Sequence, residues 1–502
     1  MLRLLILFLI PIAGKLSAQS KVIEISRESQ PNEVSIAIDR KDPHKMVAGA
    51  NINSLYLSND GGITWSRTEQ VSQYGVWGDP VVIQDTSGSF YHFHLSRFEG
   101  GTWIDRLVCQ RSDDGGRSFV TDTYFGLNGK KAQDKPWATV NEKNNEIYVT
   151  WTQFDEYDSK DPKDRSNILF SKSIDRGITW SKPKRINSVS GDCLDDDNTV
   201  EGAVPSVGPN GEIYVAWSGP DGLVFNRSFD GGKSWEKEEI KIANHIGGWN
   251  LDIPGIYRAN GMPVTKCDLS VGPHRGRIYV NWAGGRNGFD NTDIFLAYSD
   301  DRGDTWSEPI RVNQDRTERH QFFTWFDIDR ETGTLWFVYH DRRNHDDEGT
   351  DVYLAWSTDG GKTFSEHKIS ESPFYPLKSV FFGDYNNISV RGDVVRPVWT
   401  RLDKKGLSVQ TAIVDTYFLL DHNNGRMELE TDAEGNLVLR RENQDEAVLR
   451  IYNLRNELLF KSSLASSTNV VTMPKTNRLE EKILRVELET EAEVLTRLWI
   501  KD

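Results

Sequence analysis

The stretch Ser58-Asn-Asp60-Gly-Gly62-Ile-Thr64-Trp65 is the first of six copies of one pattern in this 502-residue chain. All six copies fit S-x-D-x-G-x-[ST]-[WF]. In such a stretch the Asp accepts backbone N–H groups of a tight turn, the Gly accommodates a positive φ, and the aromatic ring packs between neighbouring sheets. The pattern therefore predicts six structural turns. The other five copies span residues 112–119, 173–180, 228–235, 299–306 and 357–364.

Alternating apolar strands accompany these turns. One strand directly precedes each turn, as in Ile294-Phe-Leu296, and another lies further upstream and ends in an aromatic residue, as in Ile213-Tyr-Val-Ala-Trp217. The turns recur every 54 to 71 residues, which is typical of a four-stranded blade with long loops. The chain is therefore predicted to be all-β and to form a β-propeller.

A short first strand opens each predicted blade. The sequence contains seven such strands and six turns, so we expect seven four-stranded blades. Six blades are the alternative if a terminal unit is partial. The segment Val22–Ile25 is expected to complete the last blade as a closing strand. The predicted first strands are Val34–Ile38, Val81–Asp85, Trp137–Asn141, Pro205–Gly208, Leu269–Gly272, Thr324–Ile328 and Tyr385–Val390.

Turns of this kind in blades of this length resemble the Asp boxes, or BNR repeats, of the sialidase superfamily of β-propellers. The resemblance covers roughly residues 32–418 and implies the propeller fold. It leaves the activity open, because similar boxes occur in other hydrolases, in polysaccharide lyases and in binding propellers. Sialidases add an Arg-Ile-Pro stretch, arginines that clamp a carboxylate, a Tyr–Glu nucleophile pair and an Asp acid/base. The first blade here, Glu33-Val-Ser-Ile-Ala-Ile-Asp39, lacks Arg-Ile-Pro.

Composition and the first residues indicate where the protein acts. With 60 Lys plus Arg against 75 Asp plus Glu, the formal net charge of −15 argues against a nucleic-acid partner. Residues Met1 to Ala18 carry Arg3 and an apolar run, which is typical of a signal peptide cleaved near Gln19. No other stretch is apolar enough to span a membrane. We expect a secreted monomer that is periplasmic or extracellular, with attachment to the cell surface as an open alternative.

The chain is divided in this interpretation into a signal peptide (1–18), a propeller (19–420) and a C-terminal β-rich accessory or sorting domain (421–502). Leu449-Arg-Ile-Tyr-Asn-Leu454 followed by Glu457-Leu-Leu-Phe460 resembles the C-terminal sorting sandwich of type IX secretion cargo. Asn456 stands near the place of the glycine expected there. A plain accessory β-sandwich is the alternative.

Three cysteines, Cys109, Cys193 and Cys267, are too far apart in sequence for a zinc site. In an oxidising compartment one pair could form a disulfide. We expect Cys193 and Cys267, because each lies shortly before the predicted first strand of a neighbouring repeat.

Acidic residues stand where six of the seven first strands begin. The first strands line the channel of a propeller, so these residues should converge on one face. Two facing carboxyl groups, one ionised and one protonated, can hydrolyse a glycosidic bond. Alternatives are a ring that binds structural Ca²⁺, with no cofactor otherwise required, or acids that cap turns. The acids are Glu33, Asp79, Asp134, Glu201, Asp268 and Asp384; the sixth unit offers Gln321, Thr324 and Asp327 instead.

Tyr385, next to Asp384, is a candidate nucleophile with an acid from another blade, because adjacent strand residues point to opposite faces. A substrate carboxylate could be bound by arginine; the candidates are Arg258, Arg342, Arg343 and Arg396. The acidic run 192–197 is a solvated loop or a Ca²⁺ site. A lyase would instead use His92 and His94 with Tyr257 or His340 as its acid/base set.

These observations favour a secreted, sialidase-like glycoside hydrolase that acts on extracellular glycans or polysaccharides through carboxylates at the mouth of the channel. Whether the chain is an enzyme stays open at this point. The alternatives are a non-catalytic glycan- or protein-binding propeller and a polysaccharide lyase on the same scaffold.

Overall fold

A computed structural model describes residues 15–16, 20–288, 290–420, 427–441, 445–466, 468–473, 476, 479, 481, 483–491 and 494–500. The predicted signal peptide lies outside them except for the short strand β1 (Lys15–Leu16). The chain divides into two compact units, residues 22–413 and residues 414–502 together with 1–21. Among the described residues, no helix combines the length and apolar character that crossing a membrane requires.

Four-stranded antiparallel sheets make up the larger unit, and six of them run in chain order. The first three consist of β3 (Ser35–Ile38), β4 (Met46–Ala50), β5 (Ser54–Ser58) and β6 (Ser66–Glu69); β7 (Gly78–Gln84), β8 (Phe90–Leu95), β9 (Leu107–Ser112) and β10 (Thr121–Phe125); and β11 (Ala132–Val140), β12 (Ile147–Phe154), β13 (Ser166–Ser173) and β14 (Lys184–Arg185). The next three consist of β15 (Glu201–Val207), β16 (Ile213–Gly219), β17 (Gly222–Ser228) and β18 (Ile240–Ala243); β21 (Val264–Cys267), β22 (Ile278–Gly284), β23 (Asp293–Ser299) and β24 (Ile310–Arg311); and β25 (Gln321–Ile328), β26 (Leu335–Asp341), β27 (Asp351–Ser357) and β28 (Ser365–Lys368).

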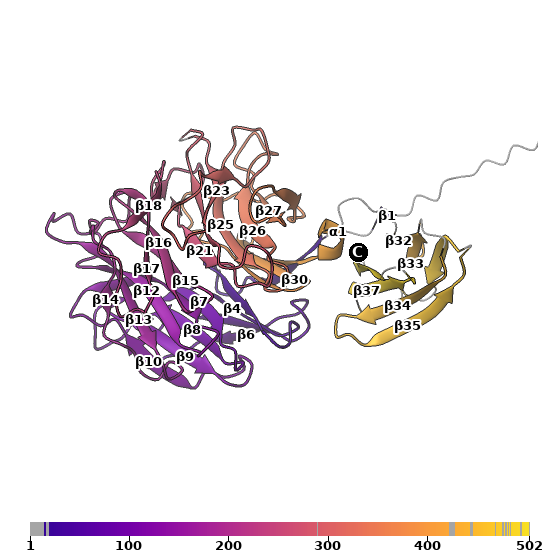
Figure 1. Cartoon of the computed structure of the whole chain (residues 1–502), viewed down its shortest axis with the longest axis horizontal. Coiled ribbons are helices and arrows are strands. Elements are labelled where there is room, and N and C mark those ends of the chain that lie inside the picture. The colour runs from indigo at the N-terminus through magenta and orange to yellow at the C-terminus, as the bar shows by residue number, and fades with distance from the viewer. Residues whose placement is uncertain are drawn as a thin grey trace, which may run out of the picture. The chain divides into compact units, whose positions relative to one another are not determined.

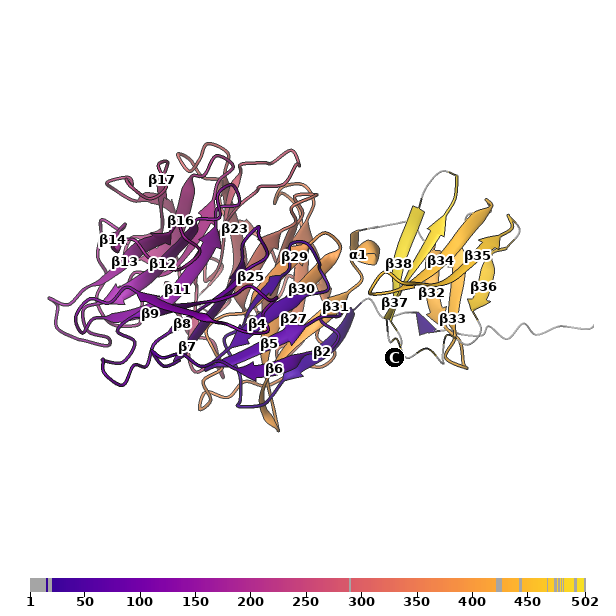
Figure 2. The same cartoon turned by 90° about the horizontal axis from the view of Figure 1, so that it is seen from below.

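A seventh sheet joins the two ends of this unit. It contains β29 (Asn387–Arg391), β30 (Val394–Asp403), β31 (Gly406–Val414) and, beside β31, the early strand β2 (Ser20–Ser26). Figure 2 shows the indigo β2 next to the orange β31. The predicted closing strand is therefore present.

The first strands of the seven sheets follow one another in space. Four of them, β7, β15, β21 and β25, are labelled in Figure 1. They contact each other in the order β3, β7, β11, β15, β21, β25 and β29, and β29 contacts β3 again. Residues at the starts of these strands are therefore brought together from distant parts of the sequence.

The six repeated stretches form the expected turns. In the first, Ser58 Oγ donates to Asp60 Oδ1 (2.9 Å) and accepts the Gly62 N–H (2.9 Å). Asp60 in turn accepts the Thr64 N–H (3.0 Å) and hydroxyl (2.6 Å). All of these contacts lie within seven residues, which is why the turn can be recognised in the sequence.

Aromatic residues of the boxes pack onto the preceding sheet. The ring of Trp306, after β23, lies 5.1 Å from that of Phe225 on β17, and the ring of Trp235 lies 5.2 Å from that of Phe170 on β13. Both contacts join apolar side chains of adjacent sheets into one core. Each box therefore connects neighbouring sheets as well as neighbouring strands.

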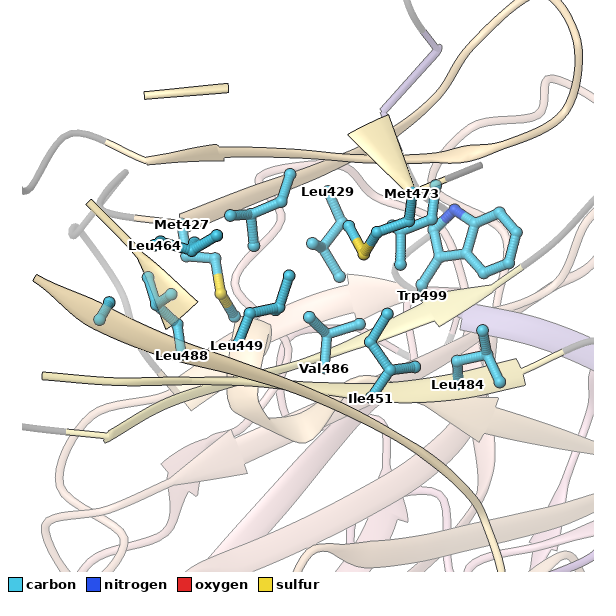
Figure 3. Packing of buried hydrophobic residues seen from close by; sticks show 13 residues of the cluster. Met427, Leu429, Leu449, Ile451, Leu464, Met473, Leu484, Val486, Leu488 and Trp499 are labelled. Carbon is cyan, nitrogen blue, oxygen red and sulfur yellow. The ribbon is translucent and has the colours of Figure 1, made fainter. Parts of the chain in front are cut away.

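The smaller unit contains two four-stranded sheets, β1, β32 (Met427–Thr431), β33 (Leu437–Arg441) and β36 (Val470–Met473), and β35 (Leu458–Leu464), β34 (Ala447–Asn453), β37 (Ile483–Glu489) and β38 (Val494–Ile500). A short helix, α1 (Thr416–Leu420), precedes β32. Side chains of both sheets share one core around Leu449, Val486 and Trp499 (Figure 3). Asn456 has a φ of 62° in the turn between β34 and β35, a conformation that Asn tolerates in place of glycine.

Two expectations about the fifth sheet are wrong. Its first strand is Val264–Cys267, not Leu269–Gly272, because residues 268–276 form a turn in which Asp268 Oδ1 accepts the Ser270 N–H (2.7 Å). Cys267 therefore ends a strand instead of preceding one, and its N–H bonds Ser206 near the end of β15. Cys193 lies before the start of β15. All three cysteines are buried free thiols, so the Cys193–Cys267 disulfide is not formed.

Candidate active site

Strained backbone marks the starts of the first strands. Glu33, Asp79 and Lys135 have φ values of 49°, 50° and 46°, in a region that side chains other than glycine seldom occupy. A register irregularity follows at the same level in β7, β11 and β15. Strain of this kind persists only where surrounding contacts impose it, and it is common at functional sites.

Glu33 and Asp79 are joined through Asn51. The Asn51 side chain donates to Glu33 Oε2 and accepts the Asp79 N–H (2.8 Å). Both side chains are buried. Two carboxyl groups this close in a buried place disfavour a second negative charge, and Asp79 raises the pKa of Glu33.

Lys135 lies at the centre of the remaining acids. Its Nζ is 3.1 Å from Asp384 Oδ2 and 3.8 Å from both Asp134 Oδ2 and Glu201 Oε2. Its backbone N–H points to Asp79 Oδ2 (3.3 Å). Lys135 therefore contacts carboxyl groups at or just before the first strands of four different sheets.

Arg258 approaches the same acids from the segment between β19 (Asn250–Leu251) and β20 (Ala259–Asn260). Its Nε donates to Asp384 Oδ1 (2.9 Å), a second nitrogen binds Asp384 Oδ2, and a third binds Asp195 (2.5 Å). Trp249 Nε1 donates to Asp195 Oδ1 (2.7 Å), and Asn260 donates to the Asp384 carbonyl (3.0 Å). Hydrogen bonds from Arg258, Trp249 and Asn260 therefore hold this segment against the acids.

These surroundings shift the pKa values of two of the acids in opposite directions. Burial and the nearby Asp134 raise the pKa of Asp79 to about 7. Burial also opposes ionisation of Asp384, but Arg258 and Lys135 outweigh it and hold the pKa of that carboxyl well below its usual range. Near neutral pH, Asp79 can carry a proton while Asp384 is ionised.

Two further acids favour the protonated form. Burial, with a contribution from Asp79, raises the pKa of Glu33, and burial, with a contribution from Asp195, raises that of Glu201. Neither Glu201 carboxylate oxygen has a hydrogen-bond partner among the described residues. The surroundings thus favour the protonated form of Asp79, Glu33 and Glu201, beside the two cations Lys135 and Arg258.

Tyr385 lies beneath the acids. Burial, together with Asp79 and Glu33, raises the pKa of its hydroxyl, which has no hydrogen-bond partner in the described part of the chain. Its ring packs against Trp137 (5.0 Å) and Trp325 (6.4 Å), whose rings lie 4.3 Å apart. These three rings form a layer across the first strands.

Aromatic side chains also extend outward from the site. Tyr157 donates to Asp195 (3.0 Å), and its ring meets that of Trp103 edge-on at 5.3 Å. Trp103 is 45% exposed and contacts Trp77 on its other side. A solvent-exposed indole is therefore connected to the Arg258–Asp384 pair through two intervening residues, Tyr157 and Asp195.

Several predicted residues lie elsewhere. Asp268 follows β21, at the opposite end of the first strands, because that strand begins earlier than expected. Asp327 pairs with Lys266 at that same end (3.1 Å). The fifth unit instead places Met262 near the site, against Trp249 and Gly202.

The other predicted arginines have local partners away from the acids. Arg343 binds Asp341 (2.7 Å) and Glu366, and Arg396 donates to the Gly61 carbonyl (2.8 Å) within a box turn. Arg342 donates to Thr350 (3.1 Å). Of the four arginines predicted to bind a substrate carboxylate, only Arg258 contacts these acids.

The histidines of the lyase hypothesis are not brought together. His92 and His94 are buried side by side on β8, where their rings lie 5.3 Å apart. His340 is enclosed by phenylalanine rings, and burial lowers its pKa to about 3. Tyr257 is 59% exposed and packs against Phe381.

Lys135 and Asp195 were missed as site residues in the sequence. Lys135 precedes a proline at the start of its strand, as Asp79 does, and this shared Asp/Lys-Pro position could have indicated it. Asp195 was not singled out because it belongs to the acidic run 192–197, which was interpreted as a solvated loop or a Ca²⁺ site. Among the described residues, no group of three or more His, Cys, Asp or Glu side chains has the arrangement of a metal site.

Comparison with known proteins gives one sequence match and several distant structural ones. The BNR/Asp-box repeat family matches residues 56–67, which is the first box. The Hadza microbial sialidase Hz136 is 14% identical, with 74% of this chain and 73% of that chain covered and a TM-score of 0.40. A GH93 α-L-arabinofuranosidase of Fusarium graminearum is 14% identical (71% and 99% covered, TM-score 0.44). An ulvan lyase is 12% identical (79% and 94% covered, TM-score 0.43). At these values no activity can be transferred to this chain.

Proposed function

We propose that this chain is a glycoside hydrolase built on a closed, seven-bladed propeller of the sialidase-like kind, with Asp79 and Asp384 as its acid and its base or nucleophile. The proposal is supported above all by the surroundings of these two carboxyl groups, which raise the pKa of Asp79 and lower that of Asp384. Paired acids whose surroundings separate their pKa values are the usual machinery of glycosidic hydrolysis. Lys135 contacts both, through its N–H and its ammonium group.

The chemistry divides between the two carboxyl groups. Asp79, protonated near neutral pH, donates its proton to the glycosidic oxygen as the bond to the leaving sugar breaks. The ionised Asp384 carboxylate attacks the anomeric carbon or activates a water there. Lys135 and Arg258 keep Asp384 charged in a buried place where it would otherwise take up a proton.

The substrate we propose is a neutral glycan, not a sialoside. A sialidase-like clamp needs arginines that are free to bind the substrate carboxylate, whereas the nitrogens of Arg258 already bind Asp384 and Asp195. The exposed ring of Trp103 provides an apolar surface of the kind that lines ligand sites and could carry a sugar ring.

Assays of the purified chain against aryl glycosides of neutral sugars, an aryl sialoside and uronate polysaccharides test this proposal. We expect phenol release from a neutral glycoside, lost by at least 100-fold in Asp79→Asn and Asp384→Asn. Asp268→Asn is the matched control, because it changes a buried acid at the other end of the first strands. Loss of activity in all three variants, or in none, would contradict the assignment.

A non-catalytic glycan-binding propeller is the second candidate. It is favoured by the complete burial of Asp384 and Glu201 beneath the segment that carries Arg258. Binding to a glycan array without turnover of any glycoside would support this candidate. An unsaturated product from a uronate polysaccharide would instead support a lyase, for which the buried His92 and His94 offer no site.

We further propose that residues 1–18 direct secretion and that the protein is a monomer. The C-terminal unit is proposed to have a sorting or accessory role. Secretion is supported by the apolar run within residues 1–18, and the role of the C-terminal unit by the stretch 449–460. Mass spectrometry of the exported chain, with and without residues 421–502, tests both cleavage near Gln19 and the need for the C-terminal unit.

A further inference from the structure

A second polar site lies at the opposite end of the first strands. There the strands enclose a cavity of about 170 Å³, to which all seven contribute. The rings of Trp137 and Trp325 line it on one side, and Tyr385, which packs against both, faces the acids. The aromatic layer therefore separates this cavity from the proposed active site.

The charges around this cavity are mainly positive. Arg40, Lys266, Arg330 and Arg391 line it, and two carboxylates oppose them, Asp327 in its lining and Glu142 beside it. Four cations against two acids leave an excess of two positive charges. The proposed active site at the other end has the opposite balance, with six carboxyl groups around Lys135 and Arg258.

The two acids are already engaged with three of the cations. Glu142 Oε1 binds both Arg40 (2.7 Å) and Arg330 (2.8 Å). Asp327 binds Lys266 (3.1 Å) and accepts the Val390 N–H (3.0 Å). No further carboxylate is available from this set to balance the fourth cation.

Arg391 is that fourth cation. Its Nε is buried and has no hydrogen-bond partner, and no acid of the described chain lies within ion-pair distance of it. Burial lowers the pKa of this guanidinium, and the nearby Arg40 lowers it further. Arg391 as a whole is half-buried, but an unpaired guanidinium with a buried Nε is costly, and a bound anion would reduce that cost.

We propose that this cavity binds a small divalent oxyanion, inorganic phosphate or sulfate, with Arg391 as its principal ligand and Arg40, Arg330 and Lys266 around it. Guanidinium groups match the oxygen spacing of such anions. Because a single water needs about 10–15 Å³ of such space, the cavity has room for an oxyanion and a few waters. An oligosaccharide would not fit. The inference is independent of the proposed hydrolase activity.

Calorimetric titration of the full chain with sodium phosphate and sodium sulfate, at constant ionic strength maintained with chloride, tests this site. We expect saturable binding of one anion per chain and an affinity at least tenfold weaker in Arg391→Gln. Lys266→Gln is a second variant and should also weaken binding. Arg401→Gln, on β30 and outside the cavity lining, is the control and should bind as the wild type does.

Two results would overturn the proposal: no saturable binding by the wild type, or equal affinities in the wild type and in a folded Arg391→Gln variant. A sugar sulfate monoester is titrated in parallel. Binding of the ester without binding of the free anion would likewise rule out a site for a small ion. Glycosidase activity should be unchanged in Arg391→Gln, which separates this test from that of the proposed function.

Discussion

The glycine at the fifth position of each box turn shows how single residues join the sheets. Gly303 has a φ of 95°, and a Cβ at this position would lie 2.3 Å from the ring of Phe225 on the preceding sheet. Gly232 meets Phe170 in the same way, at 2.2 Å. Glycine is therefore required here for two reasons, the backbone conformation and the close approach of the next sheet.

Gly303→Ala should destabilise the protein by more than Gly115→Ala. Both glycines have a positive φ, so both variants incur about 1–2 kcal/mol of backbone strain. A Cβ at Gly115 meets nothing within 4 Å, whereas at Gly303 it overlaps Phe225, which adds about 1–3 kcal/mol. Urea unfolding of the two variants measures the difference. Equal free energies of unfolding would show that the packing contact contributes nothing.

At the scale of elements, the segment from β19 to β20 determines how Asp384 is ionised. It places Arg258 over the first strands and holds it there through Asp195, which also accepts hydrogen bonds from Trp249 and Tyr157. The paired carboxyl groups therefore depend on a loop inserted between two sheets, and not only on the strands that carry them.

Arg258→Met should make activity sensitive to acid. Removing the guanidinium takes away the larger of the two attractions that keep Asp384 ionised, so its pKa should rise by about 1–3. Because Asp384 must be ionised, activity should then be lost at a higher pH as the solution is made more acidic. The pH dependence of kcat/KM between pH 3 and 6 measures this. An unchanged acidic limb would mean that Arg258 does not control Asp384.

The same elements show what the sequence could and could not predict. The box turns and most strands follow from contacts within a few residues, so the six boxes and the closing strand β2 were predicted correctly. The start of β21 was not predicted correctly, because Val264–Cys267 and Leu269–Gly272 are equally short segments that could both form a strand. Lys135 was missed as a site residue because Asp384, its closest partner, belongs to the last sheet.

At the scale of the whole molecule, the buried acids make the stability of the larger unit depend on pH. Asp79, with a folded pKa of about 7 against about 3.9 unfolded, binds an extra proton in the folded state between these values. Stability must then fall as pH rises through this window, and Glu33 and Glu201 act in the same direction. Box aspartates such as Asp230, with a pKa lowered to about 2, stabilise the fold above the unfolded value and lose this effect as pH falls toward 2.

The melting temperature should therefore be higher at pH 5 than at pH 8. Asp79→Asn should reduce this difference, because the titrating group accounts for up to about 3 kcal/mol of linked free energy between these two pH values. Calorimetry at both pH values measures the effect. A wild-type protein that melts at a higher temperature at pH 8 would contradict the proton content assigned to the site.

The pH dependence of kcat/KM for an aryl glycoside with a good leaving group, measured for the wild type and Asp79→Asn, tests the paired carboxyl groups most directly. If Asp79 is the acid, wild-type activity falls as pH rises through about 7. In Asp79→Asn the activity that remains, since a good leaving group needs little protonation, should not show this fall. A variant that keeps the same descending limb, or a wild type that turns over no glycoside while it binds glycans, would contradict the assignment of Asp79 and Asp384 as a catalytic pair.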